Sequence, residues 1–449
     1  MNKKRGIGII LVFCICCGIV IVGRMLSTEH KMSILGSNGE EIAAVTYSDG
    51  EIQFSGNEAY QPYVELVLQE VQKVCPDETV KDLIHKDVVV QTVFDKEIYD
   101  SLQDAYELEN FNLLNNTASV VSDIEGRILA CYSNGRDEKN YVMEPTYAAS
   151  TIKPLSVYGP AIEAGVINWS SMYMDSAYMQ VEEKGIMKDW PVNTRPFRNQ
   201  KIPIVQALKE SNNAIAVKIL KDYGIQKSCN LLQSQLGLDV SYEQEVLKSE
   251  EEDDVLSNLA LGYLKGGVTV RQMAENYQIF ASGGLRHSTY TIEKISIKDK
   301  SYYTHQEEEG NRVFTEGTAY IMNRLLKEVV SEGGTAAKAQ IDGVDICGKT
   351  GTSLDYQDNW FVGITPELIC ATWYEESNPE IHTENEAVLI VKDVIESMKD
   401  DIVTAYPVAE SVVRKTYCLS TGKLANTQCQ NTGEGYYDTN YLPALCDCQ

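Results

Sequence analysis

Three strand-like runs follow one another late in the chain, and helix-like segments precede and follow them. The runs cover residues 343–352, 359–364 and 368–373. Residues 318–330 place apolar side chains on one helical stripe before the runs, and residues 386–398 do the same after them. Residues 118–132 are typical of a hairpin that turns at Glu125 and Gly126. These patterns predict an α/β (α+β) sandwich, in which helices flank an antiparallel sheet.

The rest of the chain carries a similar mixture of patterns. Residues 42–54 are typical of a hairpin, and residues 60–74 of an amphipathic helix. Residues 88–93 form a β-branched run, which predicts a buried strand. Thr269 and Gln272 form a capping box that opens a further helix. A chain of 449 residues has room for two or three domains, or for one large domain with appendages.

The N-terminal sequence predicts the cellular location of the chain. Lys3, Lys4 and Arg5 precede an apolar run that Arg24 closes. The run is close to the roughly 20 residues that a helix needs to cross a bilayer, and no small-residue cleavage site follows it. Basic residues before such a run place that end in the cytoplasm. We expect an uncleaved signal anchor with the rest of the chain outside the cell. A cleaved signal would leave the same domain outside but free.

The predicted organisation has five parts. They are a cytoplasmic N-terminus (1–5), a transmembrane signal anchor (6–26), a membrane-proximal small domain or linker (27–85), a main domain (86–405) and a Cys-rich C-terminal tail (406–449). The formal net charge of -26 argues against nucleic-acid binding, which needs a basic face to meet phosphates. No cofactor is expected, because the chain lacks dinucleotide and phosphate-loop fingerprints.

The cysteines predict covalent cross-links rather than a metal site. Four of the 12 crowd the tail, namely Cys418, Cys429, Cys446 and Cys448. In an extracytoplasmic tail this indicates one or two disulfides. No His accompanies the four cysteines and their spacings are irregular, which disfavours a zinc site. No metal is therefore expected.

One short pattern supplies a nucleophile with a neighbouring base. Ser150 and Lys153 stand three residues apart, so on a helix they share a face and their side chains can meet. Burial lowers the pKa of a Lys, which would let Lys153 act as a base. The pattern alone is weak, because Ser420 and Lys423 repeat it in the tail with a Gly between them. A Ser-His-Asp triad is disfavoured, since none of the five His lies near a nucleophile motif.

Two further motifs follow at a distance. Ser211 and Asn213 form S-x-N, which has chance matches elsewhere in the chain. Residues 349–352 read Lys-Thr-Gly-Thr, and no other K-T-G occurs. Gly351 has no side chain, so we expect a ligand backbone to approach the strand edge there. By the two-residue period, Thr350 and Thr352 should project to one face of the strand and Lys349 to the other.

Taken together and in this order, the motifs resemble the active-site set of the penicillin-recognising serine enzymes. The flanking residues extend the resemblance over roughly residues 85–398, and the transpeptidase region looks most like that of two-function penicillin-binding proteins. The matching stretches are residues 147–154, 190–193, 207–214, 259–262, 268–269, 280–284 and 359–366. The main domain (86–405) is then a transpeptidase domain of the penicillin-binding and β-lactamase-like fold.

The resemblance implies a role for each matched residue. Ser150 would attack a D-alanyl-D-alanine stem peptide of peptidoglycan, and Lys153 would take its proton. Ser211 would relay the proton to the leaving D-alanine, and Asn213 would hold the substrate amide. Lys349 would supply positive potential, Thr350 and Thr352 would bind the terminal carboxylate, and Gly351 and Trp190 would line the substrate site. The backbone amides of Ser150 and Thr352 would form an oxyanion hole. β-Lactams would acylate Ser150 and remain covalently attached to it.

The implied function is peptidoglycan cross-linking at a bacterial cell membrane by a single-pass protein. Two-function relatives carry a glycosyltransferase domain, for which residues 27–85 are too short, so a separate polymerising partner is expected. Two alternatives stay open. One is hydrolysis by the same acyl-enzyme, as in a D,D-carboxypeptidase or a β-lactamase. The other is a non-catalytic β-lactam sensor or wall-assembly scaffold. The sensor is disfavoured by a cytoplasmic segment of about five residues.

Overall fold

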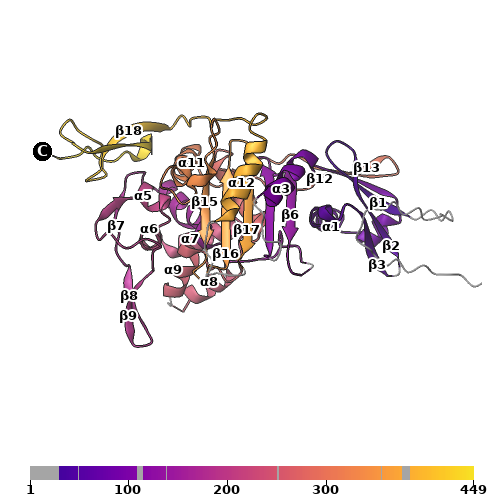
Figure 1. Cartoon of the computed structure of the whole chain (residues 1–449), viewed down its shortest axis with the longest axis horizontal. Coiled ribbons are helices and arrows are strands. Elements are labelled where there is room, and N and C mark those ends of the chain that lie inside the picture. The colour runs from indigo at the N-terminus through magenta and orange to yellow at the C-terminus, as the bar shows by residue number, and fades with distance from the viewer. Residues whose placement is uncertain are drawn as a thin grey trace, which may run out of the picture.

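The structure is a computed structural model. It describes residues 30–48, 50–108, 115–137, 139–249, 252–354, 356–376 and 385–448. Within these ranges no helix is both long and apolar enough to cross a bilayer. The predicted anchor at residues 6–26 lies outside the described residues. The molecule is elongated, with one sheet at one end, a second sheet in the middle and a C-terminal hairpin at the other end (Figure 1).

A five-stranded antiparallel sheet forms the centre of the molecule. Its strands follow the order β15-β16-β17-β5-β6, so β15 is an edge strand. Their bounds are Cys347–Thr352 (β15), Asp358–Ile364 (β16), Leu368–Glu375 (β17), Thr117–Asp123 (β5) and Ile128–Asn134 (β6). All neighbouring pairs are antiparallel. The sequence pattern therefore predicted this sheet correctly, including the hairpin at residues 118–132.

Helices cover both faces of this sheet. On one face lie α3 (Lys96–Leu108) and α12 (Glu386–Ser397). Gly363 of β16 points at α12, because an added Cβ would lie 2.6 Å from a methyl group of Val391. Its neighbour Trp360 points to the opposite face, where its indole N–H donates to the backbone of Tyr147. Helix α10 (Val270–Tyr277) packs on that second face. The predicted sandwich is confirmed in this arrangement.

A helical region adjoins the second face and carries most of the remaining helices. It begins with the segment that contains Ser150 and continues through short helices to α11, which packs against β15. The helices are α4 (Gly159–Glu163), α5 (Ile204–Lys209), α6 (Asn213–Tyr223), α7 (Ile225–Ser234), α8 (Ser241–Leu247), α9 (Glu252–Leu261) and α11 (Glu316–Val330). Three short strands, β7 (Met172–Met174), β8 (Met179–Glu183) and β9 (Ile186–Trp190), lie beside them with β10 (Lys201–Pro203).

A six-stranded sheet lies at the N-terminal end, in the order β13-β12-β4-β1-β2-β3. Its strands are β1 (Lys31–Leu35), β2 (Glu41–Ser48), β3 (Glu51–Gly56), β4 (Val88–Thr92), β12 (Ile292–Ile297) and β13 (Lys300–Thr304). Helices α1 (Gln61–Val74) and α2 (Val80–Ile84) accompany it. We call this part the pedestal. The boundary predicted at residue 85 falls among strands that share this one sheet, because β4, β12 and β13 all come after it.

Strand β4 also differs from its prediction. The β-branched run predicted a strand buried on both faces, yet its residues alternate between buried and more exposed, and Val89 is 36% exposed. In this region, one face of the pedestal sheet is therefore packed against the protein and the other is exposed to solvent.

The C-terminal segment forms a small lobe. Strands β18 (Val412–Cys418) and β19 (Thr432–Asp438) pair as a hairpin, and the following residues fold back over it. The four tail cysteines lie here as free thiols, so the predicted disulfides are not formed in this structure. Three small pairs complete the described part of the fold: β7 with β10, β8 with β9, and β11 (Leu285–Arg286) with β14 (Asn311–Arg312).

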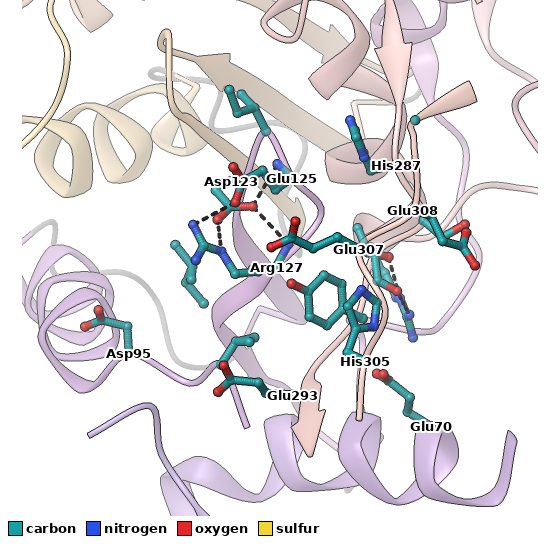
Figure 2. A pocket seen from close by; sticks show the side chains of 18 of the residues that line it. Glu70, Asp95, Asp123, Glu125, Arg127, His287, Glu293, His305, Glu307 and Glu308 are labelled. Carbon is teal, nitrogen blue, oxygen red and sulfur yellow. Dashed lines mark hydrogen bonds and ion pairs between the residues drawn. The ribbon is translucent and has the colours of Figure 1, made fainter. Parts of the chain in front are cut away.

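A polar hollow of about 1480 Å³ separates the pedestal from the central sheet, and acidic side chains surround it (Figure 2). At its base, the buried Glu70 of α1 reaches across to the start of β12. Its Oε2 accepts hydrogen bonds from the backbone N–H of Thr291 at 2.6 Å and from the Thr291 hydroxyl at 2.8 Å. This carboxylate therefore ties the pedestal helix to the strand that enters its sheet from far along the chain.

We expect Glu70→Ala to lower the free energy of unfolding by about 1–3 kcal/mol, because it leaves buried donors of Thr291 without an acceptor. The measurement is urea unfolding followed by circular dichroism. Gln69→Ala, at an exposed position of the same helix, is the matched control and should change little. Equal stabilities of the two variants would contradict this role for Glu70.

Candidate active site

The segment that carries Ser150 and Lys153 is helical but irregular. A 3-10 turn, η2 (Ala149–Ile152), leads into a π-helical turn, η3 (Pro154–Tyr158), and then into α4. The prediction of a helix is right, although the helix is not a regular α-helix. Ser150 is half-buried, so its hydroxyl is within reach from outside, whereas Lys153 is fully buried. A strained turn thus presents a reachable hydroxyl above a buried amine.

Two glycines make room for this turn. Ala149 has a φ of +46°, a conformation that costs energy in a residue with a side chain. Its backbone N–H donates to the carbonyl of Gly262 at 3.2 Å. A Cβ on Gly262 would lie 2.0 Å from the Ala149 carbonyl oxygen. A Cβ on Gly351 would lie 2.9 Å from the carbonyl oxygen of Ala148. Gly262 and Gly351 therefore let two other parts of the chain close on the serine turn.

Gly351 has a packing role within the protein. The atoms that a Cβ there would meet lie at Ala148, Thr151 and Trp360. Approach of a ligand backbone at Gly351 stays a prediction. Gly351 is needed so that β15 can pack against the serine turn.

The amine of Lys153 joins the first motif to the second. Its Nζ donates to Oδ1 of Asn213 at 2.6 Å and to the backbone carbonyl of Ser211 at 2.8 Å. The Ser211 hydroxyl lies 3.4 Å away. Among the described residues, no hydrogen bond to the Ser150 hydroxyl is formed. Lys153 therefore meets the S-x-N motif, whereas the expected hydrogen bond between Lys153 and the Ser150 hydroxyl is not formed.

The third motif reaches the same point from β15. Nζ of Lys349 donates to the Ser211 hydroxyl at 2.9 Å and to the carbonyl of Thr350 at 2.9 Å. Ser211 has a φ of +58°, a second strained position in the site. The hydroxyl of Ser211 therefore lies between two lysine amines that come from distant parts of the chain.

Both amines are fully buried, and this sets their charge. Burial lowers the pKa of Lys349 to about 7. For Lys153, burial and then the neighbouring Lys349 hold the pKa well below its usual range. Burial and the neighbouring cation both favour the neutral form of Lys153. A neutral amine carries a lone pair with which it can accept a proton.

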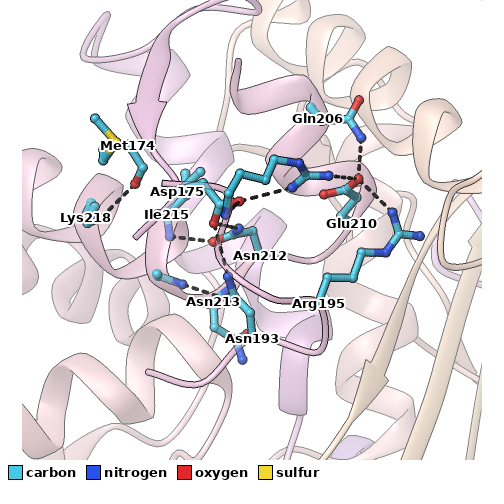
Figure 3. A network of polar contacts seen from close by, with 12 residues as sticks. Met174, Asp175, Asn193, Arg195, Gln206, Glu210, Asn212, Asn213, Ile215 and Lys218 are labelled. Carbon is cyan, nitrogen blue, oxygen red and sulfur yellow. Dashed lines mark hydrogen bonds and ion pairs between the residues drawn. The ribbon is translucent and has the colours of Figure 1, made fainter. Parts of the chain in front are cut away.

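A polar network behind the S-x-N motif holds its backbone in place (Figure 3). Asn212 caps α6, since its Oδ1 accepts from the N–H of Ile215 at 2.9 Å, and its Nδ2 donates to Asp175 at 2.8 Å. Arg198 bridges Asp175 at 3.1 Å and Glu210 at 2.6 Å. The buried acids are thus paired with cations, as burial requires.

The amide of Asn213 is fixed from a second side. Its backbone N–H donates to Oδ1 of Asn193 at 2.8 Å, and its Nδ2 donates to the carbonyl of Val192 at 2.7 Å. These bonds leave the Asn213 oxygen turned toward Lys153. The segment from residue 190 to 193 therefore positions the motif.

The other predicted site residues have separate surroundings. Thr350 shares a hydrogen bond of 2.7 Å with the hydroxyl of Thr335, while Thr352 is exposed at the end of β15. Trp190 is half-buried and packs edge-on against Tyr178, with ring centroids 6.1 Å apart. Substrate binding by Thr350, Thr352 and Trp190 stays a prediction. Trp360 is fully buried and belongs to the core.

Sequence reasoning missed the supporting residues Asp175, Arg198 and Glu210. Each is a single charged residue in a polar stretch, where a solvated surface position is the ordinary expectation. The only sequence signal was the position of Glu210 directly before Ser211. The large polar hollow beside the pedestal is separate from the candidate active site, since none of the predicted site residues lines it.

Comparisons with known proteins agree with this geometry. The penicillin binding protein transpeptidase domain model matches residues 116–395, and the chain belongs to this family. Penicillin-binding protein 1F of Bacillus subtilis is 32% identical over 266 residues, which cover 58% of this chain and 34% of that protein. Penicillin-binding protein 1A of Streptococcus oralis is 27% identical over 363 residues, covering 74% and 54%. The chain thus spans about a third to a half of these relatives' lengths.

The fold is shared with solved structures. The crystal structure of penicillin-binding protein 1A from Haemophilus influenzae has a TM-score of 0.70 at 17% identity, covering 88% of this chain and 78% of that chain. The D,D-transpeptidase domain of a peptidoglycan glycosyltransferase from Eggerthella lenta has a TM-score of 0.63 at 17% identity, covering 83% and 99%. At this identity the likeness shows the fold alone.

We expect Gly262→Ala to slow covalent capture of penicillin by roughly 100-fold, the order of effect that a 1 Å misplacement has on a reacting group. The added methyl group would push against the Ala149 carbonyl and move Ser150. The measurement is the second-order acylation rate with a fluorescent penicillin. Gly237→Ala is a matched control, because Gly237 also has positive φ (+65°) but its Cβ would meet only the end of Arg286, at 3.4 Å. Equal slowing in both variants would rule out the packing explanation.

Proposed function

We propose that this protein is a serine D,D-transpeptidase that cross-links peptidoglycan stem peptides through an acyl-enzyme on Ser150. Membership of the transpeptidase family supports cell-wall cross-linking and β-lactam binding in general. The observation that carries the finer proposal is the meeting of Lys153, Lys349 and the Ser211 hydroxyl below a reachable Ser150.

Acylation begins with proton transfer from Ser150. Lys153 is kept neutral by burial and by Lys349, and the free lone pair on its Nζ accepts the proton of the Ser150 hydroxyl. The oxygen of Ser150 then attacks the carbonyl carbon of the penultimate D-alanine. Its new C–O bond gives a tetrahedral oxyanion, which the backbone amides of Ser150 and Thr352 stabilise.

The leaving group receives its proton through Ser211. Lys349 donates to the Ser211 oxygen, which leaves the Ser211 hydrogen free to be passed on. As the peptide C–N bond breaks, Ser211 gives this proton to the amine of the departing D-alanine and regains one from Lys153. The terminal carboxylate of the donor peptide is held by Thr350 and Thr352 with the positive potential of Lys349.

The donor peptide lies along the edge of the central sheet. Among the described strands, β15 pairs with β16 alone, and the proposal places the extended peptide along the other edge of β15. Asn213 holds the substrate amide, and Trp190 lines the substrate site in this proposal. An amine of a second stem peptide then attacks the acyl-enzyme and releases Ser150.

The same acyl-enzyme would serve a hydrolase if water reached it. A D,D-carboxypeptidase or β-lactamase is therefore the second candidate, and a non-catalytic sensor or scaffold the third. Anchoring of the chain through residues 6–26, with the catalytic domain outside a bacterial membrane, and a separate glycan-polymerising partner stay predictions of the sequence.

We expect Ser150→Ala to abolish covalent capture of penicillin, because the attacking oxygen is removed. Intact-mass measurement after incubation with penicillin checks this. Ser420→Ala is the matched control, since it changes the second S-x-x-K match, at an exposed position of the tail, and should leave capture intact. Product analysis with a stem peptide and an amine acceptor separates the candidates. Hydrolysis without any cross-linked product would overturn the transpeptidase proposal.

The acylation rate should rise with pH as Lys153 loses its proton, at a pH far below the usual pKa of a Lys. Because Lys349 lowers the pKa of Lys153, Lys349→Met should raise that pKa and move the rising limb to higher pH. Acylation rates measured from pH 5 to 10 check the shift. A slower variant whose limb stays in place would show that Lys349 only binds substrate and does not tune Lys153.

A further inference from the structure

The four tail cysteines meet at one point of the C-terminal lobe. Cys418 ends β18, Cys429 lies in the connection to β19, and Cys446 and Cys448 lie in the segment that folds back. Their sulfur atoms all lie within 4.8 Å of one another. Residues separated by as much as 30 positions in the chain have therefore been brought together around a single centre.

The spacing of the sulfurs suits a tetrahedral ion. The Sγ of Cys448 lies 3.8 Å from that of Cys418 and 3.1 Å from that of Cys446. A zinc ion with four Zn–S bonds of about 2.3 Å separates its sulfurs by about 3.8 Å. Cys448 lies nearest to Cys446, and its distance from Cys418 equals the sulfur–sulfur separation of such a zinc tetrahedron.

Hydrogen-bond donors already face the sulfurs. The backbone N–H of Asn426 donates to Cys429 at 3.4 Å, and that of Cys448 donates to Cys446 at 3.5 Å. The Thr421 hydroxyl lies 3.2 Å from the sulfur of Cys446. Such donors orient thiolates and spread their charge around a bound metal.

The backbone holds the cysteines in place without a cross-link. The N–H of Cys446 donates to the carbonyl of Leu424 at 2.7 Å, and the side-chain amide of Asn426 donates to the carbonyls of Cys446 and Cys448 at 2.9 and 3.1 Å. Few large side chains are buried in the lobe, chiefly Tyr417 and Tyr437. A lobe with so small a core is the kind that a structural metal stabilises.

We propose that Cys418, Cys429, Cys446 and Cys448 form a closed, structural tetrathiolate site for Zn²⁺. All four positions of the ion are filled by the protein, so the site has no place for a substrate. Binding replaces each S–H proton, which goes to solvent, with a Zn–S bond, and nothing is oxidised or reduced. This reverses our expectation from the sequence, where irregular spacing disfavoured zinc.

The lobe contacts the main domain on α11 and also on residues 169–170, the segment directly before β7. The Tyr437 hydroxyl donates to Ser170 at 2.9 Å, and Ser170 donates to the carbonyl of Gly422 at 2.6 Å. The ring of Tyr436 packs edge-on against Trp169. This segment leads directly into β7, which precedes Asp175 of the network behind Asn212. By holding the lobe together, the metal would therefore stabilise the surface on which the residues directly before β7 pack.

The full chain should be purified with zinc present and no chelator. We expect about one zinc per chain by elemental mass spectrometry. Replacing zinc with Co²⁺ should give the thiolate-to-cobalt charge-transfer absorption of a four-sulfur site. Cys418→Ser and Cys446→Ser should each lose most of the zinc and lower the melting temperature of the zinc-loaded protein. Cys75→Ala, a buried free cysteine of the pedestal, is the matched control and should keep the ion.

Peptide mapping of the alkylated, unreduced protein decides between metal and disulfides. Four alkylated tail cysteines in a chain that carried one zinc would support the site. Tail peptides linked to one another by disulfides, with no zinc above the level of the Cys418→Ser and Cys446→Ser variants, would overturn it. Penicillin capture should persist in both cysteine variants if they fold, so failure of the zinc proposal leaves the function of Ser150 to be judged separately.

Discussion

Two buried lysine amines on either side of one serine hydroxyl are the interaction on which the site depends. Within the described part of the chain, neither Lys153 nor Lys349 forms an ion pair with a carboxylate, and both are removed from water. Their mutual repulsion and their burial act in the same direction, toward loss of a proton. The protein thereby favours an unprotonated amine base at ordinary pH without a histidine. The unfavourable free energy of removing two amines from water must be offset by packing elsewhere in the domain.

That packing places strain where the chemistry requires it. Ala149 and Ser211 both adopt positive φ, and each sits beside a residue that the proposed mechanism uses. The first is held by the backbone of Gly262, and the second follows a buried Glu210 that two arginines neutralise. The strained turns are thus fixed by contacts that do not themselves react. This explains why a short sequence motif needs a large domain around it.

Much of the fold and most of the site could be predicted from the sequence, for physical reasons that differ between elements. The strands and helices of the central sheet follow from the periodicity of their apolar residues, and their ends deviate by only a few residues. The site followed from a resemblance, since S-x-x-K alone also occurs at Ser420. The periodicity of residues 292–304 gave no indication that they pair with the pedestal, because partner choice depends on long-range packing. The irregular spacing of the tail cysteines likewise concealed a compact cluster, since a folded-back loop removes any need for regular spacing.

The interleaved pedestal has a consequence for biogenesis. During synthesis from the N-terminus, β1 to β4 are made long before β12 and β13. One edge of β4 therefore stays unpaired while about 200 further residues are synthesised. During that interval the open edge is available to other chains or to chaperones. The pedestal therefore cannot be separated from the main domain or transferred to another one, because two of its six strands, β12 and β13, come from within the main domain.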